Sequence, residues 1–464
     1  MTFQNNTLNE QAFKFHMEGK FKEADRAYQL AIASDKRNPD LIANYSSLLI
    51  RMGRLEDAFN MSKWAMMYGP RLAVAWNNAG LCMTHLDRYD ESLRYFQKAS
   101  ELDPTHPMIL QNLGDSLNNC GFHQEAIETL KEAVAINPND TMAQANLGMA
   151  YWGAGDLERA ETELWSAVFK NPLLPRPRKN LGQVMLTRGN YEGWVHYELR
   201  LQDDGVVNRT TVPTWNGTNE PVFVQSEQGL GDQILHASML GDLSMRTEVT
   251  WECDARLVNL IQSAHPGVNV VPFRTVPQIN EPSQIFACSL GKVLRPYAGS
   301  FPTRSTYLFA DAEKVQSYKD MFKGKVVGIS WLSSNTRIGK VKSRPLSDWK
   351  AIFEVPGITF VDLQYGNTVA ERLGFPITHV EGLDLKMDID GVAALTSACD
   401  LVITVSNTTA HLAGALGVPT WVIAPDSIGK LWYWGTEETT PWYPTVKLFR
   451  GADALDQVSE ALSA

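Results

Sequence analysis

The sequence predicts a protein of two parts, an α-helical repeat array followed by an α/β region with two lobes. Two observations carry this prediction: a 34-residue period in the first half, and strand-like apolar runs that alternate with helical segments in the second. The 464 residues suffice for several separate cores. We divide the chain into a repeat array (1–201), a linker (202–219), a first lobe (220–321) and a second lobe (322–464).

The repeat array is marked by residues that recur every 34 positions. Turn residues share one phase: Gly19, Gly53, Asp87, Gly121, Gly155 and Gly189. Prolines close successive repeats: Pro70, Pro104, Pro138 and Pro172. Each unit is therefore expected to be a helix, a tight turn and a second helix that ends at the proline. This pattern resembles the tetratricopeptide repeat, whose units stack into a superhelix with a concave groove.

A row of asparagines occupies one position on the first helix of successive repeats, which lines the groove of such a superhelix. Its members are Asn44, Asn78, Asn112, Asn146 and Asn180. An amide side chain carries both a donor and an acceptor, so this asparagine ladder can hold the backbone of an extended polypeptide. The alternative is helix-to-helix packing, which the sequence leaves open. The arrangement resembles that of the O-linked N-acetylglucosamine transferases.

The linker carries polar and turn residues, among them Asp203, Gly205 and Gly217. Two tryptophans flank or lie within it, Trp194 and Trp215. We expect both to pack on the following domain, which favours close docking over a flexible tether.

The second half alternates strand-like and helical segments, which predicts parallel sheets with ligands at the carboxyl ends of their strands. The predicted strands are Val222–Ser226, Val249–Cys253, Val268–Val271, Ile285–Cys288, Val326–Trp331, Ile358–Leu363, Leu401–Val405 and Trp421–Ile423. We expect two Rossmann-like lobes that face a cleft.

A polar loop separates the strand Leu401–Val405 from a small-residue helix. It contains Ser406, Asn407, Thr408 and Thr409, and His411 follows. Free backbone N–H groups and the helix dipole favour an anion at a helix N-terminus, and hydroxyls add donors. Helix capping is the alternative, but one cap explains only one such residue. We therefore predict a phosphate site.

The first lobe carries Gly229, Gly231 and Asp232 directly after its first strand. The spacing is not the dinucleotide-binding GxGxxG, so no nicotinamide site is expected. Asp232 can serve as a general base at the mouth of the cleft or as a helix cap. Glu227 and His236 are the alternative bases.

The second lobe opens with Ser330 and Asn335, followed by the basic residues Arg337, Lys340, Lys342 and Arg344. Basic side chains in an acidic chain suit a diphosphate. The turn at Gln364, Tyr365 and Gly366 suits a nucleoside or is an ordinary strand end. An aromatic cluster, Trp432, Tyr433, Trp434, Trp442 and Tyr443, is expected to pack between lobes rather than stack on sugar.

Several of these motifs together resemble the GT-B glycosyltransferases of the heptosyltransferase group. They are Gly231-Asp232, Lys342 with Pro345 and Trp349, and Ser406–His411 with the helix that follows. The resemblance implies that Asp232 is the general base and that Lys342 binds donor phosphate. It also implies an inverting reaction that needs no metal.

The phosphate loop departs from the Asp-Thr-Gly of the heptosyltransferases and reads Ser406-Asn407-Thr408. Thr408-Thr409 is similar to the paired threonines of the O-linked N-acetylglucosamine transferases, which favours a UDP-sugar such as UDP-GlcNAc. We expect donor binding by Gly231, Ser330, Asn335, Lys342, Gln364, Ser406, Asn407, Thr408, Thr409 and His411. Asp388-Ile-Asp390 resembles a metal-binding DxD motif, but we interpret it as a helix start and expect neither metal nor cofactor.

Charge and composition restrict the partners. The formal charge of −10 argues against nucleic acid and anionic membranes. Five scattered cysteines without a CxxC pair, no signal peptide and no apolar run near ~20 residues favour the cytoplasm. We expect a glycosyltransferase that modifies Ser or Thr of a polypeptide acceptor. The alternatives are an enzyme of glycan assembly and a non-catalytic repeat scaffold.

Overall fold

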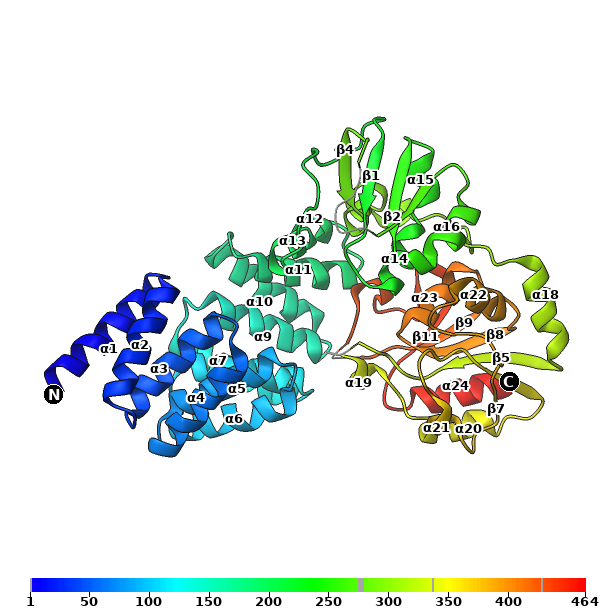
Figure 1. The fold of residues 1–464 in the computed structure, drawn as a ribbon. Coiled ribbons are helices and arrows are strands. Elements are labelled where there is room, and N and C mark those ends of the chain that lie inside the picture. Colours follow the sequence, from blue (N-terminus) through cyan, green and yellow to red (C-terminus); the bar gives the residue numbers. More distant parts are fainter. Residues whose placement is uncertain (1, 274–278, 336–337, 427–428) are drawn as a thin grey trace. The chain divides into compact units, whose positions relative to one another are not determined.

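The computed structural model describes residues 2–273, 279–335, 338–426 and 429–464 (Figure 1). The chain divides into two compact units, Met1–Leu173 and Leu174–Ala464. The last helices of the 34-residue pattern therefore pack with the second unit. Within the described ranges, no helix combines the length and the apolar character that a membrane crossing requires.

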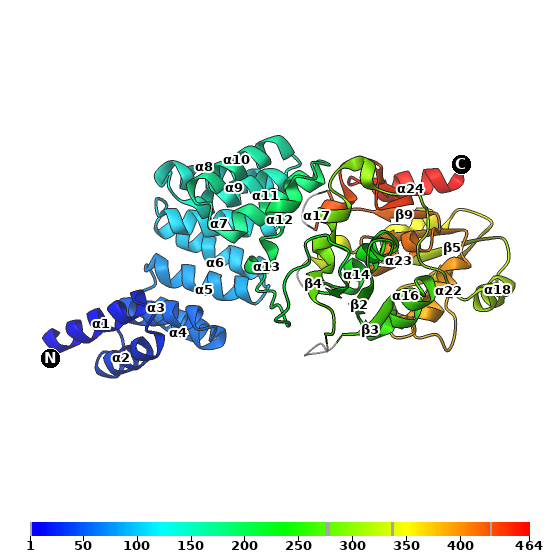
Figure 2. The ribbon, with the colours of Figure 1, turned by 90° about the horizontal axis from the view of Figure 1, so that it is seen from above.

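The first unit is a stack of helix pairs, which follow one another along the chain in Figures 1 and 2. Its helices are α1 (Thr2–Met17), α2 (Phe21–Ser34), α3 (Pro39–Arg51), α4 (Leu55–Tyr68), α5 (Ala73–His85), α6 (Tyr89–Leu102), α7 (Pro107–Asn119), α8 (His123–Ile136), α9 (Thr141–Gly153) and α10 (Leu157–Lys170). The predicted turns are confirmed: Gly19 has φ +75°, and Asp87 takes the same left-handed conformation with φ +56°. Small alanines such as Ala24, Ala58 and Ala126 are fully buried between the helices.

The second unit begins with α11 (Pro175–Thr187), α12 (Gly193–Tyr197) and α13 (Arg200–Asp203). Trp194 is buried, and its indole N–H donates to the carbonyl of Arg295 at 2.9 Å. Trp215 is also buried, and its backbone N–H donates to the carbonyl of Gln284 at 2.7 Å. Both tryptophans therefore dock on the α/β region as predicted.

The first lobe contains a four-stranded parallel sheet. Its order is β3 (Asn269–Pro272), β2 (Val249–Cys253), β1 (Val222–Gln225) and β4 (Ser283–Phe286). The helical segments around it are α14 (Leu230–Ala237), α15 (Leu240–Ser244), η1 (Ala255–Leu257), α16 (Val258–Ala264), η2 (Ala287–Ser289), α17 (Leu290–Leu294) and η3 (Ala298–Ser300).

The second lobe contains a seven-stranded sheet, parallel except for its edge strand β10. Its order is β10 (Thr439–Thr440), β11 (Tyr443–Phe449), β9 (Thr420–Ile423), β8 (Leu401–Val405), β5 (Lys325–Ser330), β6 (Ile358–Asp362) and β7 (Ile377–Thr378). Its helical segments are α19 (Gly339–Lys342), η4 (Leu346–Trp349), α20 (Lys350–Phe353), α21 (Val369–Arg372), α22 (Ile389–Ser397), α23 (Thr408–Ala415), η5 (Trp432–Trp434) and α24 (Ala454–Ser463). Helix α18 (Ala312–Met321) packs on α22 of this lobe, although the sequence division placed residues 312–321 in the first lobe.

The strand order of each sheet marks where a ligand can enter. In both sheets the first strand pairs on one side with the strands that follow it directly, and on its other side with strands from later in the chain. This reversal lies between β1 and β4 in the first lobe and between β5 and β8 in the second. At such a reversal the connections leave on opposite faces, and a crevice opens at the carboxyl ends of the strands. The loops after β1, β5 and β8 therefore lie at the predicted ligand-binding edges.

All eight predicted strands occur, with ends displaced by at most two residues. The sequence analysis missed β7, β10 and β11. Strands β7 and β10 have only two residues each, too few for a periodic pattern. Strand β11 was interpreted only as the end of an aromatic cluster, although Tyr443, Val446 and Leu448 are buried in it.

Candidate functional site

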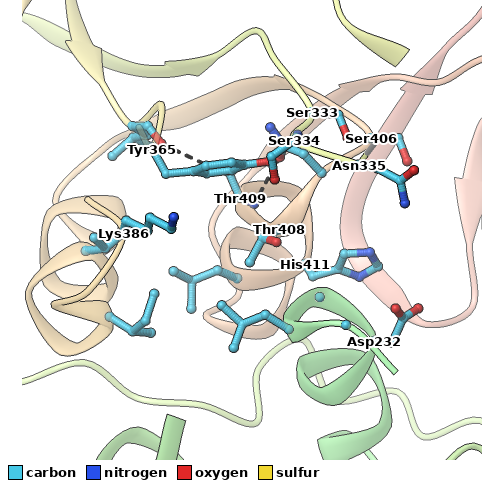
Figure 3. A pocket seen from close by; sticks show the side chains of 18 of the residues that line it. Asp232, Ser333, Ser334, Asn335, Tyr365, Lys386, Ser406, Thr408, Thr409 and His411 are labelled. Atoms are coloured by element: carbon cyan, nitrogen blue, oxygen red, sulfur yellow. Dashed lines mark hydrogen bonds between the residues drawn. The ribbon is translucent and has the colours of Figure 1, made fainter. Parts of the chain in front are cut away.

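A pocket of about 340 Å³ lies at the carboxyl ends of strands from both lobes. The first lobe lines it with the loop after β1 and with Arg256 after β2, and the second with the loops after β5, β6 and β8. Figure 3 shows Tyr365 and Lys386 at one end and Asp232 and His411 at the other, with Thr408 between them. Apolar side chains such as Leu385 complete the wall.

Asp232 lines this pocket from the first turn of α14, whose N-cap is Gly229. Burial raises the pKa of its carboxyl to about 6, although the Lys342 ammonium and the backbone N–H groups of Gly229 and Asp232 act in the opposite direction. Because Gly229 is the N-cap and α14 has no side-chain cap hydrogen bond, the position of Asp232 is compatible with the predicted base role and not with that of the N-cap. A pKa near 6 leaves the carboxylate ionised but basic at neutral pH.

Lys342 lines the pocket from the end of α19. Burial lowers the pKa of its ammonium to about 8, and the Asp232 carboxylate partly offsets this. Lys340 on the same short helix is exposed. Arg344 donates to the carbonyls of Val341 and Ser343 instead of lining the pocket. Arg337 lies outside the described residues.

Two further cations line the pocket that the sequence analysis did not identify, Arg256 and Lys386. Arg256 is paired with Asp254 at 2.8 Å and also donates to the carbonyl of Lys386 at 3.1 Å. Neither residue belongs to a sequence motif. The segments that carry them are distant in the sequence and come together only where the lobes meet. With Lys342 they make three cations against Asp232, the one acidic residue of the described lining, in a chain of net charge −10.

The polar loop after β8 is held largely by the fold itself. Asn407 caps α23, since its Oδ1 accepts from the backbone N–H of Thr409 at 2.9 Å, and its Nδ2 donates to Ser330 Oγ at 2.8 Å. Ser406 Oγ accepts from the indole of Trp434 at 2.9 Å. The Thr409 hydroxyl donates to Ser330 Oγ or to the Leu363 carbonyl.

Thr408 differs from its neighbours because its half-buried hydroxyl lines the pocket without a hydrogen-bond partner among the described residues. It is also the first residue of α23, where the dipole favours an anion. The capping alternative therefore accounts for Asn407, whereas Thr408 retains the character of a ligand-binding group.

Ser330 and Gln364 do not line the pocket, contrary to their predicted place among the donor-binding residues. Gln364 Oε1 accepts from Ser330 Oγ at 2.9 Å and from the backbone N–H groups of Trp331 and Leu332 at 2.8 and 2.7 Å. Both side chains are fully buried and fix the loop after β5 from beneath. The polar character of these two residues pointed to the site. Only their hydrogen-bond partners show that they support the loop and do not line the pocket.

Asn335 and Tyr365 lie where the loops after β5 and β6 meet. Asn335 is exposed at the pocket, and its Oδ1 accepts from the N–H of Ile338 at 2.9 Å. The Tyr365 hydroxyl accepts from the N–H of Ser334 at 3.2 Å, which turns the flat ring along the pocket wall (Figure 3). An aromatic ring here suits a nucleobase, as the sequence suggested.

His411 lines the pocket but is itself buried and fully hydrogen-bonded. Its Nδ1 lies 2.8 Å from the Tyr443 hydroxyl and its Nε2 lies 3.3 Å from the Tyr433 hydroxyl. Burial lowers its pKa to about 3, helped by the Lys342 ammonium. Gly231 permits this packing, because a Cβ there would lie 2.7 Å from Cδ2 of His411.

The alternative bases are occupied or sequestered. The Glu227 side chain, only 3% exposed, forms an ion pair with Arg200 at 2.8 Å. His236 is buried outside the lining, and burial lowers its pKa to about 3, with the Arg200 guanidinium acting in the same direction. Asp232 is therefore the better placed of the three candidates.

The asparagine ladder makes contacts between repeats. The Asn78 amide donates to the carbonyl of Ala43 at 2.9 Å, and the Asn112 amide donates to Oδ1 of Asn77 at 2.9 Å. Asn44 and Asn146 are half-buried, and their amides have no hydrogen-bond partner among the described residues. Asn180 is buried in the second unit. Helix-to-helix packing thus accounts for two of the five.

The DxD-like sequence starts a helix, as expected. Asp388 is the N-cap of α22, and its carboxylate accepts from the N–H of Gly391 at 2.8 Å. Asp390 accepts from the Asn259 amide at 3.3 Å. In the part of the chain that the structure describes, no group of three His, Cys, Asp or Glu side chains is arranged to hold a metal ion.

Comparison with known proteins gives a family assignment for part of the chain. Two tetratricopeptide-repeat family models match, at residues 73–106 and 121–176. These helix pairs are tetratricopeptide repeats. Among solved structures, that of the MamA protein covers 37% of this chain and 94% of its own, at 23% identity and a TM-score of 0.32.

Two curated relatives match more closely in sequence. Protein FlbA of Caulobacter vibrioides is 33% identical over 293 residues, which cover 56% of this chain and 49% of that protein. Type IV pilus assembly protein PilF of Pseudomonas aeruginosa is 30% identical over 107 residues, 22% of this chain and 42% of that protein. The chain thus spans about half the length of these relatives or less. Because the FlbA match is longer than Met1–Leu173, it extends into the second unit.

Proposed function

We propose that this protein is an inverting, metal-independent glycosyltransferase that moves a sugar from a nucleoside diphosphate donor to Ser or Thr hydroxyls of a polypeptide. One observation carries the proposal: a single pocket is lined by the Asp232 carboxylate from one lobe and by Lys342 and the start of α23 from the other. Two parallel-sheet lobes that share one pocket are what a GT-B enzyme requires. A UDP-sugar is favoured by the Thr408-Thr409 pair.

The cationic side of the pocket is suited to a diphosphate. Lys342, Arg256 and Lys386 supply positive charge, and the Thr408 hydroxyl and the N-terminus of α23 supply hydrogen-bond donors. Together they stabilise negative charge on the departing diphosphate without a metal ion. Tyr365 would carry the nucleobase.

Asp232 would perform the proton transfer. As the acceptor hydroxyl oxygen forms its bond to the anomeric carbon, the bond from that carbon to the diphosphate oxygen breaks, and its electron pair leaves with the diphosphate. The hydroxyl proton passes to Asp232. A carboxylate whose pKa is about 6 is a stronger base than an ordinary aspartate and remains ionised at pH 7.

The repeats would present the acceptor. Tetratricopeptide repeats form grooves suited to polypeptides, and the amides of Asn44 and Asn146 have no partner among the described residues. We therefore assign the polypeptide to the repeats and the donor to the pocket.

The test is transfer by the full chain. We expect release of nucleoside diphosphate from UDP-GlcNAc or a related UDP-sugar, and a mass increase of one sugar residue on a co-expressed acceptor protein. Release and transfer would fall at least 100-fold with Asp232→Asn. Modification of lipid-linked glycans alone would indicate glycan assembly, and no release from any nucleotide sugar would indicate a scaffold.

A further inference from the structure

The side chain of Trp434 lies behind the polar loop after β8, outside the lining of the pocket. It is 1% exposed, and its indole N–H donates to Ser406 Oγ at 2.9 Å. An indole nitrogen can only donate, so the Ser406 oxygen is the acceptor of this hydrogen bond. The chemistry of the two groups therefore fixes the direction of the bond.

This direction decides where the hydroxyl proton of Ser406 can point. A serine hydroxyl has one proton and two lone pairs, and here one lone pair faces the indole N–H. Among the described residues, Ser406 Oγ has no second hydrogen-bond partner that would take its proton. Ser406 is buried and lines the pocket (Figure 3). The proton is therefore left for a group inside the pocket.

Thr408 brings two more donors to the pocket. Asn407 caps α23 by accepting from the N–H groups of Thr409 and Ala410 at 2.9 and 3.4 Å. The N–H of Thr408, the first residue of the helix, has no acceptor within the helix. Its hydroxyl also has no partner among the described residues. Ser406 and Thr408 thus keep their donors for a ligand, whereas the Asn407 side chain between them is committed to the fold.

The chemistry of these donors indicates which kind of ligand group they suit. Phosphate oxygens of a diphosphate only accept hydrogen bonds, and donors whose protons are not engaged elsewhere match them. A sugar hydroxyl both donates and accepts, so a freely rotating serine would bind it in either direction. Fixing the direction of the Ser406 hydroxyl is therefore useful for an anion, and Lys342 lines the same pocket.

Trp434 is held in place from several sides. Its ring stacks on His411, with ring centroids 5.2 Å apart and an interplanar angle of 23°. Its backbone carbonyl accepts from the Arg450 guanidinium at 3.0 Å, and its backbone N–H donates to the carbonyl of Leu431 at 3.1 Å. An indole fixed in this way can orient the Ser406 hydroxyl without moving itself.

We propose that Trp434 is a positioning residue that turns the hydroxyl proton of Ser406 toward the diphosphate of the nucleotide donor. This inference rests on the proposed function for the identity of the ligand. The hydroxyl is oriented before the nucleotide arrives, which lowers the ordering cost of binding. When Ser406 donates to a phosphate oxygen, its own oxygen becomes a better acceptor, so the bond from Trp434 strengthens as well.

Calorimetric titration of the full chain with UDP and with uridine tests this role. Ser406→Ala should weaken UDP binding at least tenfold, as for a hydrogen bond to a charged group, and leave uridine binding almost unchanged. Trp434→Phe keeps an aromatic ring but removes the N–H. It should weaken UDP binding severalfold on its own and have no further effect when Ser406→Ala is already present.

Trp251→Phe is the matched control, because the indole nitrogen of this buried tryptophan has no partner among the described residues. It should leave the affinities for UDP and uridine unchanged. Equal losses from Trp434→Phe with and without Ser406→Ala, or an equal loss of uridine binding, would overturn the proposal and make the tryptophan a packing residue.

A second measurement does not require that Trp434→Phe folds. In ¹H–¹⁵N NMR of the full chain labelled at its tryptophan indoles, Ser406→Ala removes the acceptor of Trp434 and so identifies its Nε1–H resonance. UDP should move this resonance downfield in the unaltered protein, because the hydrogen bond strengthens, and uridine should not. No indole resonance that responds to both Ser406→Ala and UDP would overturn the proposal.

Failure of this inference and failure of the proposed function are distinguishable. If UDP binds with these dependences but no sugar is transferred, the proposed transfer fails and the role of Trp434 in diphosphate binding stands. If sugar is transferred but Ser406→Ala does not affect UDP binding, only the present inference falls. A protein that does not bind UDP would contradict both.

Discussion

Two rows of polar side chains invite the same interpretation in the sequence and differ in the structure. In the asparagine ladder, the amides of Asn78 and Asn112 bind the neighbouring repeat. In the loop after β8, Asn407 binds its own fold, but Thr408 lines a pocket with Asp232 and Lys342. The comparison teaches that a polar pattern indicates a ligand only where its partners do not already lie within the fold.

Replacing the candidate base should give the largest effect. Asp232→Asn should reduce transfer at least 100-fold, since general bases contribute about 10²–10⁴-fold. The same change should stabilise the protein. The unfolded carboxyl ionises near pH 4 but the folded one near 6, so burying the charge costs stability as the pH rises through this window.

At pH 7 that cost is fully present, and its removal should raise the unfolding free energy by about 2–3 kcal/mol. Below pH 4 both states are protonated and the gain should vanish. Thermal melting at the two pH values measures this difference. Loss of stability together with loss of activity would indicate that Asp232 has only a structural role.

The next largest effect is expected on the binding of the nucleoside diphosphate. Lys342→Ala should weaken nucleoside diphosphate binding by about 1.5–3 kcal/mol, as for a hydrogen bond to a charged group, and leave the free nucleoside almost unaffected. Lys340→Ala is the matched control, because this exposed lysine lies on the same short helix outside the lining. Calorimetry that finds equal losses for both ligands would contradict the assignment.

The pKa values of Asp232 and Lys342 predict how kcat/KM depends on pH. Values of kcat/KM should rise with pH through about 6, as Asp232 loses its proton, and fall above about 8, as Lys342 loses its charge. Asp232→Asn should abolish the acidic limb and Lys342→Arg should move the alkaline limb upward. A flat profile between pH 5 and 9 would remove both residues from the mechanism.

Some of the features behind these predictions could be predicted from the sequence, and others could not. The 34-residue period predicted the repeats and the strand alternation predicted both sheets, because each depends on local pattern. The pocket cations Arg256 and Lys386 were not foreseen, since they meet only through contacts between distant segments. For the same reason the sequence could not show that Ser330 and Gln364 support a loop instead of lining the pocket.

A smaller effect separates the two roles of the asparagine ladder. Asn78→Ala should lower the unfolding free energy by about 1 kcal/mol, because it breaks a bond to Ala43. Asn146→Ala should leave stability unchanged and weaken binding of a polypeptide acceptor severalfold. Denaturant unfolding and acceptor titration distinguish them. Equal destabilisation by both changes would make the ladder purely structural.

The smallest effect is expected from chelation. Transfer should persist in EDTA, because cationic side chains and α23 balance the diphosphate. Asp388→Ala should cost about 1 kcal/mol of stability through loss of a helix cap, with transfer retained. Activity that EDTA abolishes and manganese restores would show that Asp388 and Asp390 bind metal.

The central claim is that the pocket transfers sugar to a polypeptide, and intact-mass measurement tests it most directly. Candidate acceptor proteins are co-expressed with the unaltered chain or with Asp232→Asn and then weighed. We predict an acceptor whose mass increases by whole sugar residues with the unaltered chain, and no increase with Asp232→Asn although the variant still binds that acceptor. Equal mass increases with both chains would contradict the account.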